Sequence, residues 1–218
     1  MILRVGSRPS LLAKEQVKEI QGFFPDLKFV HIPIKTKGDK DKLTPISDIG
    51  DGNFFTAEIE EALIKGEIDF AVHSAKDIEE NMPGVLKIAA LTKSISPYEC
   101  LVAAGNLTLK KLPPGASVGV SSNKRKAALK KYRSDLVVKD IRGNIEERLS
   151  QLDQGKFDAI VVAHAALIRL KLKNRIAEII SPEIIAPHPL QGSLALQVRS
   201  DNQRLIDLFS TVDTRRNE

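Results

Sequence analysis

Residues 2–23, ILRVGSRPSLLAKEQVKEIQGF, contain a strand pattern, a tight turn and a helix pattern in immediate succession. Hydrophobic and polar residues alternate from Ile2, as they do in a strand, whereas the apolar residues over Leu11–Phe23 recur at helical spacing. Strands that alternate with helices in this way are typical of a largely parallel sheet covered by helices. The fold class is therefore predicted to be α/β.

The rest of the chain continues this alternation in two series. The first series adds strands over 27–34 and 70–72 and a helix over 54–64. The second series begins near Cys100 and contains strands over 117–120, 136–138 and 159–162, with helices over 124–131 and 145–152. Two more helices are predicted over Leu190–Val198 and Arg204–Phe209, where they could return to the first series.

Two segments interrupt the periodic pattern with proline and small polar residues, Lys93–Pro97 and Ala186–Pro189. A chain of 218 residues that is 42% hydrophobic can form two modest cores. We therefore expect two lobes with a ligand cleft between them, joined by two hinge crossings. The first lobe is predicted to contain residues 1–92 and 193–218, the second residues 98–186, and the hinges residues 93–97 and 187–192.

Composition excludes several classes of protein. No apolar run approaches the roughly 18 residues of a membrane span, and no signal peptide is evident, so we expect a cytoplasmic protein with no membrane partner. The single cysteine, Cys100, excludes an internal disulfide, and the four histidines lack metal-ligand spacing, so no metal is expected. A net charge of +5 suits anionic ligands. Few aromatic residues and no tryptophan argue against nucleic-acid binding. We also expect the protein to be a monomer.

Basic and hydroxyl residues gather where strands give way to helices or turns. They occur over 6–10 (GSRPS), 73–77 (HSAKD), 120–125 (VSSNKR) and 141–144 (IRGN). Free amides at helix starts, serine hydroxyls and guanidinium groups bind carboxylates or phosphates, so these segments predict a site for a polyanion. The alternative is that Ser10, Ser122 and Asn144 are ordinary helix N-caps and that the arginines lie on the solvated surface.

The stretch Asp69–Asp77 is the most informative of these segments. A strand pattern ends at His73, and Lys76 and Asp77 follow at the edge of the sheet where α/β active sites form. A carboxylate in a basic cleft stays ionised, and it could stabilise a developing cation or transfer a proton. The alternative for Asp77 is a salt-bridged aspartate on the surface.

These segments resemble the motifs of the porphobilinogen deaminases, also called hydroxymethylbilane synthases. Residues 73–77 resemble the HSxKD motif, 6–10 the opening arginine-x-serine turn, 36–39 a TRGD-like loop, 121–125 the SSxRR motif, 141–149 the LRGNxxxRL motif, 158–170 the DAIxLAxAGLxRL motif and 190–192 the QG turn. The motifs occur in the order of the family over essentially the whole chain. The resemblance implies α/β folding into two periplasmic-binding-protein-like lobes.

The resemblance also implies an activity, a transferase that joins four porphobilinogen molecules head to tail, with loss of ammonia, into the linear tetrapyrrole hydroxymethylbilane. Asp77 would be catalytic and would stabilise the cationic azafulvene that forms as ammonia leaves. The partners would be porphobilinogen and its oligomers, whose carboxylates suit forked donors. The residues implied in binding substrate or cofactor are Arg8, Ser10, Ser74, Lys76, Ser121, Ser122, Lys124, Arg125, Arg142, Gly143, Arg148, Arg169, Gln191 and Gly192. Lys124 departs from the family, because a point charge replaces an arginine fork.

The resemblance implies a dipyrromethane cofactor, which the family attaches to a cysteine in a third domain. This domain and its cysteine are expected to be missing here, as in the short chlamydial members of the family, which have similar sequences at residues 54–56 and 190–194. Cys100 lies in an apolar run that predicts a core strand, so it is expected to be structural. The cofactor would then be held without a covalent bond, or be absent.

Two alternatives stay open, an active deaminase and a catalytically impaired protein that binds pyrrole carboxylates. Retention of Asp77 favours the first, and loss of the anchor favours the second.

Overall fold

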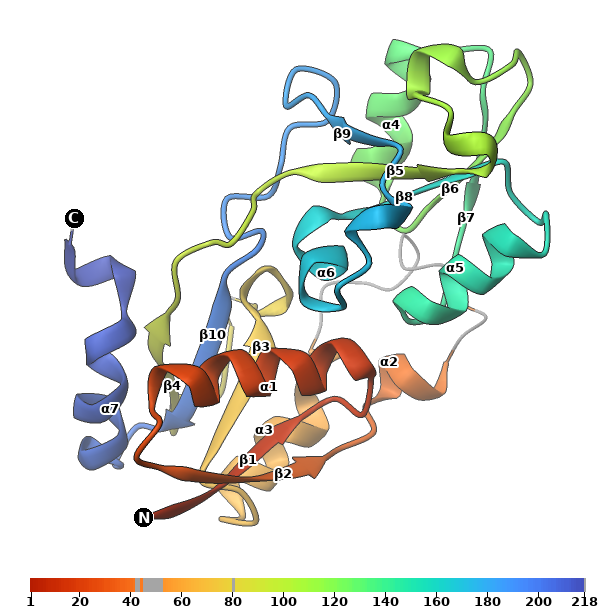
Figure 1. The fold of residues 1–218 in the computed structure, drawn as a ribbon. Helices are drawn as coiled ribbons and strands as arrows, with labels where there is room; N and C mark the ends of the chain where they lie inside the picture. The colour runs from red at the N-terminus through yellow and green to blue at the C-terminus, as the bar shows by residue number, and fades with distance from the viewer. Residues whose placement is uncertain (42–43, 45–52, 80, 218) are drawn as a thin grey trace. The chain divides into compact units, whose positions relative to one another are not determined.

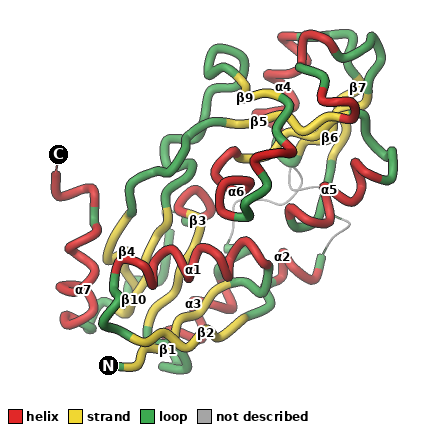
Figure 2. Tube along the Cα trace, in the orientation of Figure 1, coloured by secondary structure: helices red, strands yellow, loops and turns green. Residues whose placement is uncertain are grey.

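A computed structural model describes residues 1–41, 44, 53–79 and 81–217, and its contacts divide the chain into two compact units. Among these residues, the first unit contains 1–41, 53–95 and 192–217, and the second contains 44 and 96–191. Over residues 81–217, the chain passes from one unit to the other at two places, between Ile95 and Ser96 and between Gln191 and Gly192. Figures 1 and 2 trace the elements of each unit.

The first unit has a five-stranded sheet in the order β2-β1-β3-β10-β4. Its strands are β1 (Ile2–Ser7), β2 (Lys28–Pro33), β3 (Phe70–Ser74), β4 (Leu86–Leu91) and β10 (Leu194–Arg199). Its helices are α1 (Leu11–Phe23), α2 (Lys37–Lys40), α3 (Ala57–Ile64) and α7 (Gln203–Phe209). Strand β1 pairs in parallel with β2 and β3, whereas β10 runs antiparallel to β3 and β4.

Side chains of β3 alternate between two cores, one on each face of this sheet. Phe70 belongs to a cluster that includes Ile20 of α1 and Phe209 of α7. Its neighbour Ala71 belongs to a second cluster with Leu63 of α3. Helices α1 and α7 therefore cover one face of the sheet and α3 covers the other, which leaves the ends of the strands as the place for a site.

The second unit has another five-stranded sheet, in the order β7-β6-β8-β5-β9. Its strands are β5 (Glu99–Ala103), β6 (Ser117–Val120), β7 (Val137–Asp140), β8 (Ala159–Ala163) and β9 (Glu178–Ile180), and its helices are α4 (Asn123–Tyr132), α5 (Ile145–Asp153) and α6 (His164–Arg169). Strand β6 is parallel to β7 and β8, whereas β5 is antiparallel to β8 and β9. Helix α4 covers one face, and α5 and α6 cover the other. Short 3-10 turns complete the two units at Ala75–Asp77, Ala104–Asn106, Leu109–Lys111, Lys173–Arg175, Ser210–Val212 and Thr214–Asn217.

The predicted α/β class is confirmed, with two corrections. The sheets are mixed rather than largely parallel, because β10 and β5 run against their neighbours. The helix predicted over Leu190–Val198 is wrong, since Leu194–Arg199 forms strand β10. This strand is buried on both faces between β3 and β4, and such a strand has a continuous apolar run that periodicity does not separate from a buried helix. The helix predicted over Arg204–Phe209 is confirmed as α7.

Strands β4 and β9, which lie at one edge of each sheet, were not predicted. The cleft expected between the lobes stays a prediction. Within the described residues, no helix is both long enough and apolar enough to cross a membrane.

Candidate active site

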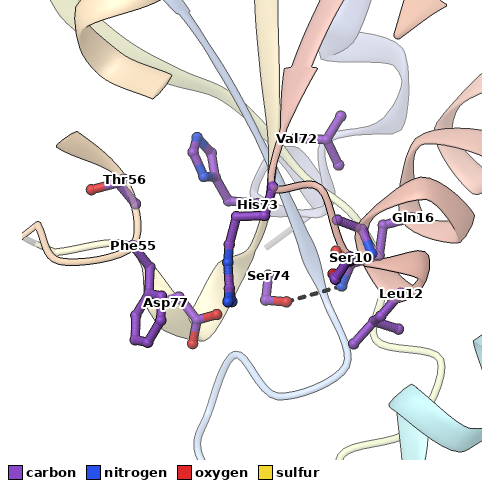
Figure 3. A pocket seen from close by; sticks show the side chains of 11 residues that line it. Ser10, Leu12, Gln16, Phe55, Thr56, Val72, His73, Ser74 and Asp77 are labelled. Carbon is purple, nitrogen blue, oxygen red and sulfur yellow. Dashed lines mark hydrogen bonds between the residues drawn. The ribbon is translucent and has the colours of Figure 1, made fainter. Parts of the chain in front are cut away.

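A pocket lies in the first unit, where the chain leaves strands β1 and β3 (Figure 3). These strands are parallel neighbours, so their carboxyl ends meet at one edge of the sheet, and the turns that follow them face a common space. The pocket has about 390 Å³ of empty volume, part of it open to solvent. It is lined by Arg8, Ser10, Leu12, Ala13, Gln16, Phe55, Thr56, Val72, His73, Ser74 and Asp77.

Ser10 caps the N-terminus of α1 at this pocket. Its Oγ accepts a hydrogen bond from the backbone amide of Ala13 at 3.2 Å, which confirms the N-cap interpretation. The cap leaves the hydroxyl hydrogen of Ser10 as a donor. The first amides of a helix have no partner within the helix and carry the positive end of its dipole. The cap is therefore compatible with anion binding at Ser10, which stays a prediction.

Arg8 enters the pocket with part of its guanidinium group already engaged. Its Nε and Nη2 donate to Oδ1 of Asp39 at 3.1 Å and 2.6 Å, and its guanidinium carbon lies 4.5 Å from the centre of the Phe55 ring. Within the part of the chain that the structure describes, Nη1 makes no hydrogen bond. Burial raises the pKa of Asp39, but hydrogen bonds from Arg8 and Thr36 more than offset this and hold it below its usual range. A charged Asp39 thus fixes Arg8 and leaves one nitrogen for a ligand.

Asp77 ends the short turn Ala75–Asp77 that follows β3. Its side chain is half-buried, and among the described residues it makes no hydrogen bond and no ion pair. Among the described residues, no ion pair supports the alternative of a salt-bridged surface aspartate. Figure 3 shows the Asp77 carboxyl group and the Ser74 hydroxyl at the pocket, with the His73 imidazole pointing away from both. Lys76, next to Asp77, is also half-buried.

The two residues before this turn are held from opposite sides. Ser74 Oγ accepts a hydrogen bond from Gln16 Nε2 of α1 at 2.9 Å. His73 is buried, and its Nε2 lies 3.1 Å from Oε1 of Gln197. Burial lowers the pKa of His73 to about 4, against the opposing effects of the Gln197 hydrogen bond and the Asp77 charge. His73 is therefore neutral near pH 7.

The second unit places basic residues after β6 and β7 in a similar way. Ser122 caps α4 by accepting from the backbone amide of Arg125 at 3.3 Å. The neighbouring Ser121 Oγ accepts from Nη1 of Arg125 at 3.3 Å and from Nη1 of Arg148 at 2.9 Å. Arg148 also donates through Nε to the carbonyl of Gly143 at 2.8 Å. Five residues expected to bind substrate or cofactor therefore gather at this end of the sheet.

Arg125 requires a correction. Its Nε and Nη2 form a bidentate ion pair with Oε1 and Oε2 of Glu99 at 2.9 Å and 2.6 Å. The guanidinium fork that was expected for a substrate carboxylate is already occupied by a residue of β5 that the motifs did not identify. A ligand contact of Arg125 stays a prediction and would have to use Nη1.

The remaining predicted residues have more local roles in the second unit. Gly143 has φ +105°, and a Cβ there would lie 2.7 Å from Oε2 of Glu147, so only glycine fits this turn. Asn144 and Glu147 form a capping box at the start of α5, as the N-cap alternative predicted. Lys124 Nζ donates to the carbonyl of Pro187 at 3.4 Å, and Arg142 and Arg169 are half-buried.

Gln191 and Gly192 lie where the chain returns to the first unit. The buried amide of Gln191 donates to the carbonyls of Pro97 and Tyr98 at 3.1 Å and 3.2 Å. Gly192 has φ +85°, which favours glycine. These contacts explain both residues as parts of the connection. Their contact with substrate stays a prediction.

Comparisons with known proteins identify the family. The family model "Porphobilinogen deaminase, dipyromethane cofactor binding domain" matches residues 3–207. The porphobilinogen deaminase of Natranaerobius thermophilus is 40% identical over 98% of this chain and 70% of that protein, and the one of Thermus thermophilus is 44% identical over 91% of this chain and 65% of that protein. The chain belongs to the porphobilinogen deaminase family. The predicted family, activity and enzyme class, a transferase of the hydroxymethylbilane synthase type, are confirmed by these matches.

Solved structures agree on the fold alone. A putative methionine-binding lipoprotein from Bacillus subtilis aligns with a TM-score of 0.55 at 16% identity, over 99% of this chain and 91% of that one. An ancestral arginine-binding protein bound to arginine aligns with a TM-score of 0.52 at 20% identity, over 97% of this chain and 90% of that one. The expected two-lobed, binding-protein type of fold is confirmed for this porphobilinogen deaminase family member.

The family model names a dipyrromethane cofactor, but Cys100 is not suited to attach it. Cys100 is fully buried in β5, and its Sγ donates to the carbonyl of Val162 at 3.5 Å. Burial, helped by the charge of Glu99, raises the pKa of the thiol to about 12. The prediction of a structural cysteine in a core strand is confirmed. Among the described residues, no group of three or more His, Cys, Asp or Glu could hold a metal ion.

The sequence did not identify Gln16, Asp39 or Phe55 as parts of the site. Gln16 had a usable signal, because it lies on the buried face of α1 with Ala13 and Ile20, where a polar residue needs a partner. Asp39 belongs to a segment that resembles a family loop, but nothing in that segment indicates that its carboxylate pairs with Arg8.

Proposed function

We propose that the pocket of the first unit is where porphobilinogen loses ammonia and is joined to the growing chain, with Asp77 as the catalytic residue. One observation carries this proposal. Asp77 presents a carboxylate with no partner among the described residues at a pocket whose lining also includes two donors, the Ser10 hydroxyl and Arg8 Nη1. Such a pocket can bind the carboxylates of a pyrrole and, at the same time, stabilise a positive charge on it.

The chemistry needs that combination. When the aminomethyl carbon of porphobilinogen loses ammonia, positive charge develops on the pyrrole, and a fixed carboxylate stabilises that charge more in the transition state than in the ground state. The carbon then bonds to the free α-carbon of the neighbouring pyrrole, which loses its proton. The amides at the start of α1, Ser10 and Arg8 Nη1 orient the substrate through its acetate and propionate.

The donors of the second unit would hold the carboxylates of the growing product. Ser121, Ser122 and Arg148 lie together, and Lys124, Arg142 and Arg169 add positive charge in the same unit. Arg125 would contribute through Nη1, since Glu99 holds its other nitrogens. In the first unit, Ser74 and Lys76 would complete the set beside Asp77.

The donor set suits the dipyrromethane cofactor, because its carboxylates are the same groups that the substrate carries. When bound, the cofactor supplies the pyrrole to which the first substrate is joined. We propose that the chain holds it by ionic contacts alone, since its only thiol is buried with a pKa of about 12. Each charge-assisted hydrogen bond would contribute on the order of 1.5 to 3 kcal/mol.

Replacement of the Asp77 carboxylate tests the proposed site. The variant Asp77→Asn should lower kcat for ammonia release from porphobilinogen about a hundredfold, with little change in the affinity for pyrrole acids. The matched control is Asp26→Asn, which changes an exposed aspartate of the same unit away from the pocket. A parent-like rate in Asp77→Asn would exclude Asp77 as the catalytic group.

Mass spectrometry tests how the cofactor is held. Protein expressed in a porphyrin-making host should have the mass of the bare chain after denaturation, and any pyrrole oligomer should appear only under native conditions. Cys100→Ala should leave this result unchanged. A dipyrromethane adduct that survives denaturation and disappears in Cys100→Ala would contradict the proposal of a non-covalent cofactor.

We propose that the protein works as a monomer in the cytoplasm, with porphobilinogen and its oligomers as its only ligands.

A further inference from the structure

Three polar side chains from three different elements form a buried chain of hydrogen bonds behind the pocket. His73 of β3 pairs through Nε2 with Oε1 of Gln197 of β10 at 3.1 Å, and Nε2 of Gln197 donates to Oε1 of Glu60 of α3 at 3.0 Å. Their exposed fractions are 6%, 0% and 5%. Neither the proposed reaction nor the motifs of the sequence use Gln197 or Glu60.

The direction of these hydrogen bonds fixes the tautomer of His73. Only the amide nitrogen of Gln197 can donate to the Glu60 carboxylate, so the amide oxygen faces His73 and can only accept. His73 Nε2 must therefore carry the hydrogen, and a neutral imidazole then has none on Nδ1. The carboxylate of Glu60 thus sets, through Gln197, which nitrogen of His73 is protonated.

The hydrogen bonds of His73, Gln197 and Glu60 also connect two segments that line the pocket. His73 directly precedes Ser74, and the turn that ends in Asp77 follows. On the other side, the backbone amide of Glu60 donates to the carbonyl of Thr56, which lines the pocket, at 2.8 Å. Strand β10 lies next to β3 in the sheet, so Gln197 connects the strand that carries the proposed catalytic turn to helix α3.

The burial of the Glu60 carboxylate is not explained by a gain in the stability of the fold. Glu60 Oε2 is buried and has no hydrogen-bond partner among the described residues. A partly satisfied polar group in a core costs free energy, and apolar side chains of similar volume would commonly be as stable or more so. The arrangement is therefore better explained by what it positions.

We propose that Gln197 and Glu60 are positioning residues that act through His73 to hold the turn bearing Asp77 in its reactive place. This inference rests on the proposed function for the role of Asp77, whereas the hydrogen-bond chain itself can be tested without any activity. The essential element is an acceptor at position 197 for the Nε2 hydrogen of His73.

The first measurement is NMR of the full chain with ¹⁵N-labelled histidine. The parent should show His73 as the Nε2–H tautomer, without titration above pH 5. In Gln197→Met, which keeps the volume but removes the acceptor, this signature should be lost. An Nδ1–H tautomer in the parent, or an unchanged His73 spectrum in Gln197→Met, would overturn the hydrogen-bond chain whatever the role of Asp77.

The second measurement is steady-state kinetics with porphobilinogen. Gln197→Met should lower kcat about tenfold with KM within about twofold, the size of effect expected from a small misplacement of a catalytic group. Gln197→Glu, whose carboxyl group shares one proton with the Glu60 carboxylate and still accepts from His73, should keep most of the activity and also serves if Gln197→Met does not fold.

The matched control is Gln21→Met. The amide of Gln21 donates to the carbonyls of Phe24 and Leu27 and accepts from the amide of Phe29, so the variant loses at least as many hydrogen bonds in the same unit, away from the pocket. Gln21→Met should lower the free energy of unfolding but leave kcat unchanged. An equal loss of kcat in Gln21→Met and Gln197→Met, or parent-like kcat in Gln197→Met, would overturn the positioning role.

Discussion

The two units repeat one sheet plan, with five strands in which three parallel strands are followed by an antiparallel one and an edge strand. In both, the central parallel strand is followed within three residues by a serine that caps the next helix, Ser10 before α1 and Ser122 before α4. The plans differ after the next strand of the sheet. Strand β3 is followed by Asp77, whereas β8 is followed by His164, whose Nδ1 pairs with Ser96 Oγ at 2.9 Å. The same sheet plan therefore presents a carboxylate after this strand in the first unit and an imidazole in the second.

Each unit also pairs an arginine close to its capping serine with a carboxylate, but in different surroundings. The Arg8 and Asp39 side chains are 30% and 15% exposed, and those of Arg125 and Glu99 are 9% and 6% exposed. Two nitrogens of Arg8 share one oxygen of Asp39, whereas Arg125 and Glu99 make a bidentate pair. The comparison indicates that Arg8 can exchange partners with a ligand, while Arg125 mainly fixes the structure around Ser121.

The largest expected effect comes from breaking the buried pair. Glu99→Gln leaves the Arg125 charge buried without a counterion, which should lower the free energy of unfolding by about 3 to 5 kcal/mol. Urea denaturation measures this loss, with Glu183→Gln, an exposed glutamate of the same unit, as control. A loss below about 1 kcal/mol would show that the two arginine pairs do not differ in the way their burial indicates.

The pH dependence of the free energy of unfolding tests how the buried histidines of the two units differ. His73 has a pKa of about 4 in the folded protein, against the ordinary histidine value of 6.5 when the chain is unfolded, so the unfolded chain binds more protons between these values. The stability it contributes, about 3 kcal/mol, is present above pH 6.5 and is lost as the pH falls towards 4. Burial also lowers the pKa values of His31 and His164, which adds to the loss.

The measurement is the free energy of unfolding in urea at intervals from pH 7 to pH 4. Most of the loss should belong to the first unit, which contains His73 and His31. The variant His73→Asn should show a clearly shallower dependence on pH than the parent. Equal slopes in the two proteins would mean that His73 is not buried in its neutral form.

The smallest expected effect on stability comes from the exposed pair. Asp39→Asn should lower the free energy of unfolding by at most about 1 kcal/mol, because solvent screens a partly exposed ion pair. The KM for porphobilinogen should nevertheless rise, since Arg8 loses the carboxylate that orients it. Ser210→Ala, remote from the pocket, is the control. An unchanged KM would indicate that Arg8 does not bind the substrate.

The sequence by itself determined the features that depend on neighbours along the chain. The strand and helix patterns indicated the α/β class, the serine caps at Ser10 and Ser122 followed from their position before helices, and the apolar run around Cys100 predicted a core strand. The order of short motifs was enough to identify the family. These features are local, so periodicity, capping and composition report them directly.

Only the tertiary structure decided which distant groups meet. Gln197 lies 124 residues from His73, and Glu99 lies 26 residues from Arg125, so no local pattern relates the partners in either pair. Whether residues 194–199 form a helix or a strand also depended on the sheet, because a strand buried between two others carries no periodic signal. The antiparallel insertion of β10 beside β3 brings Gln197 to His73 and so completes the support of the turn that carries Asp77.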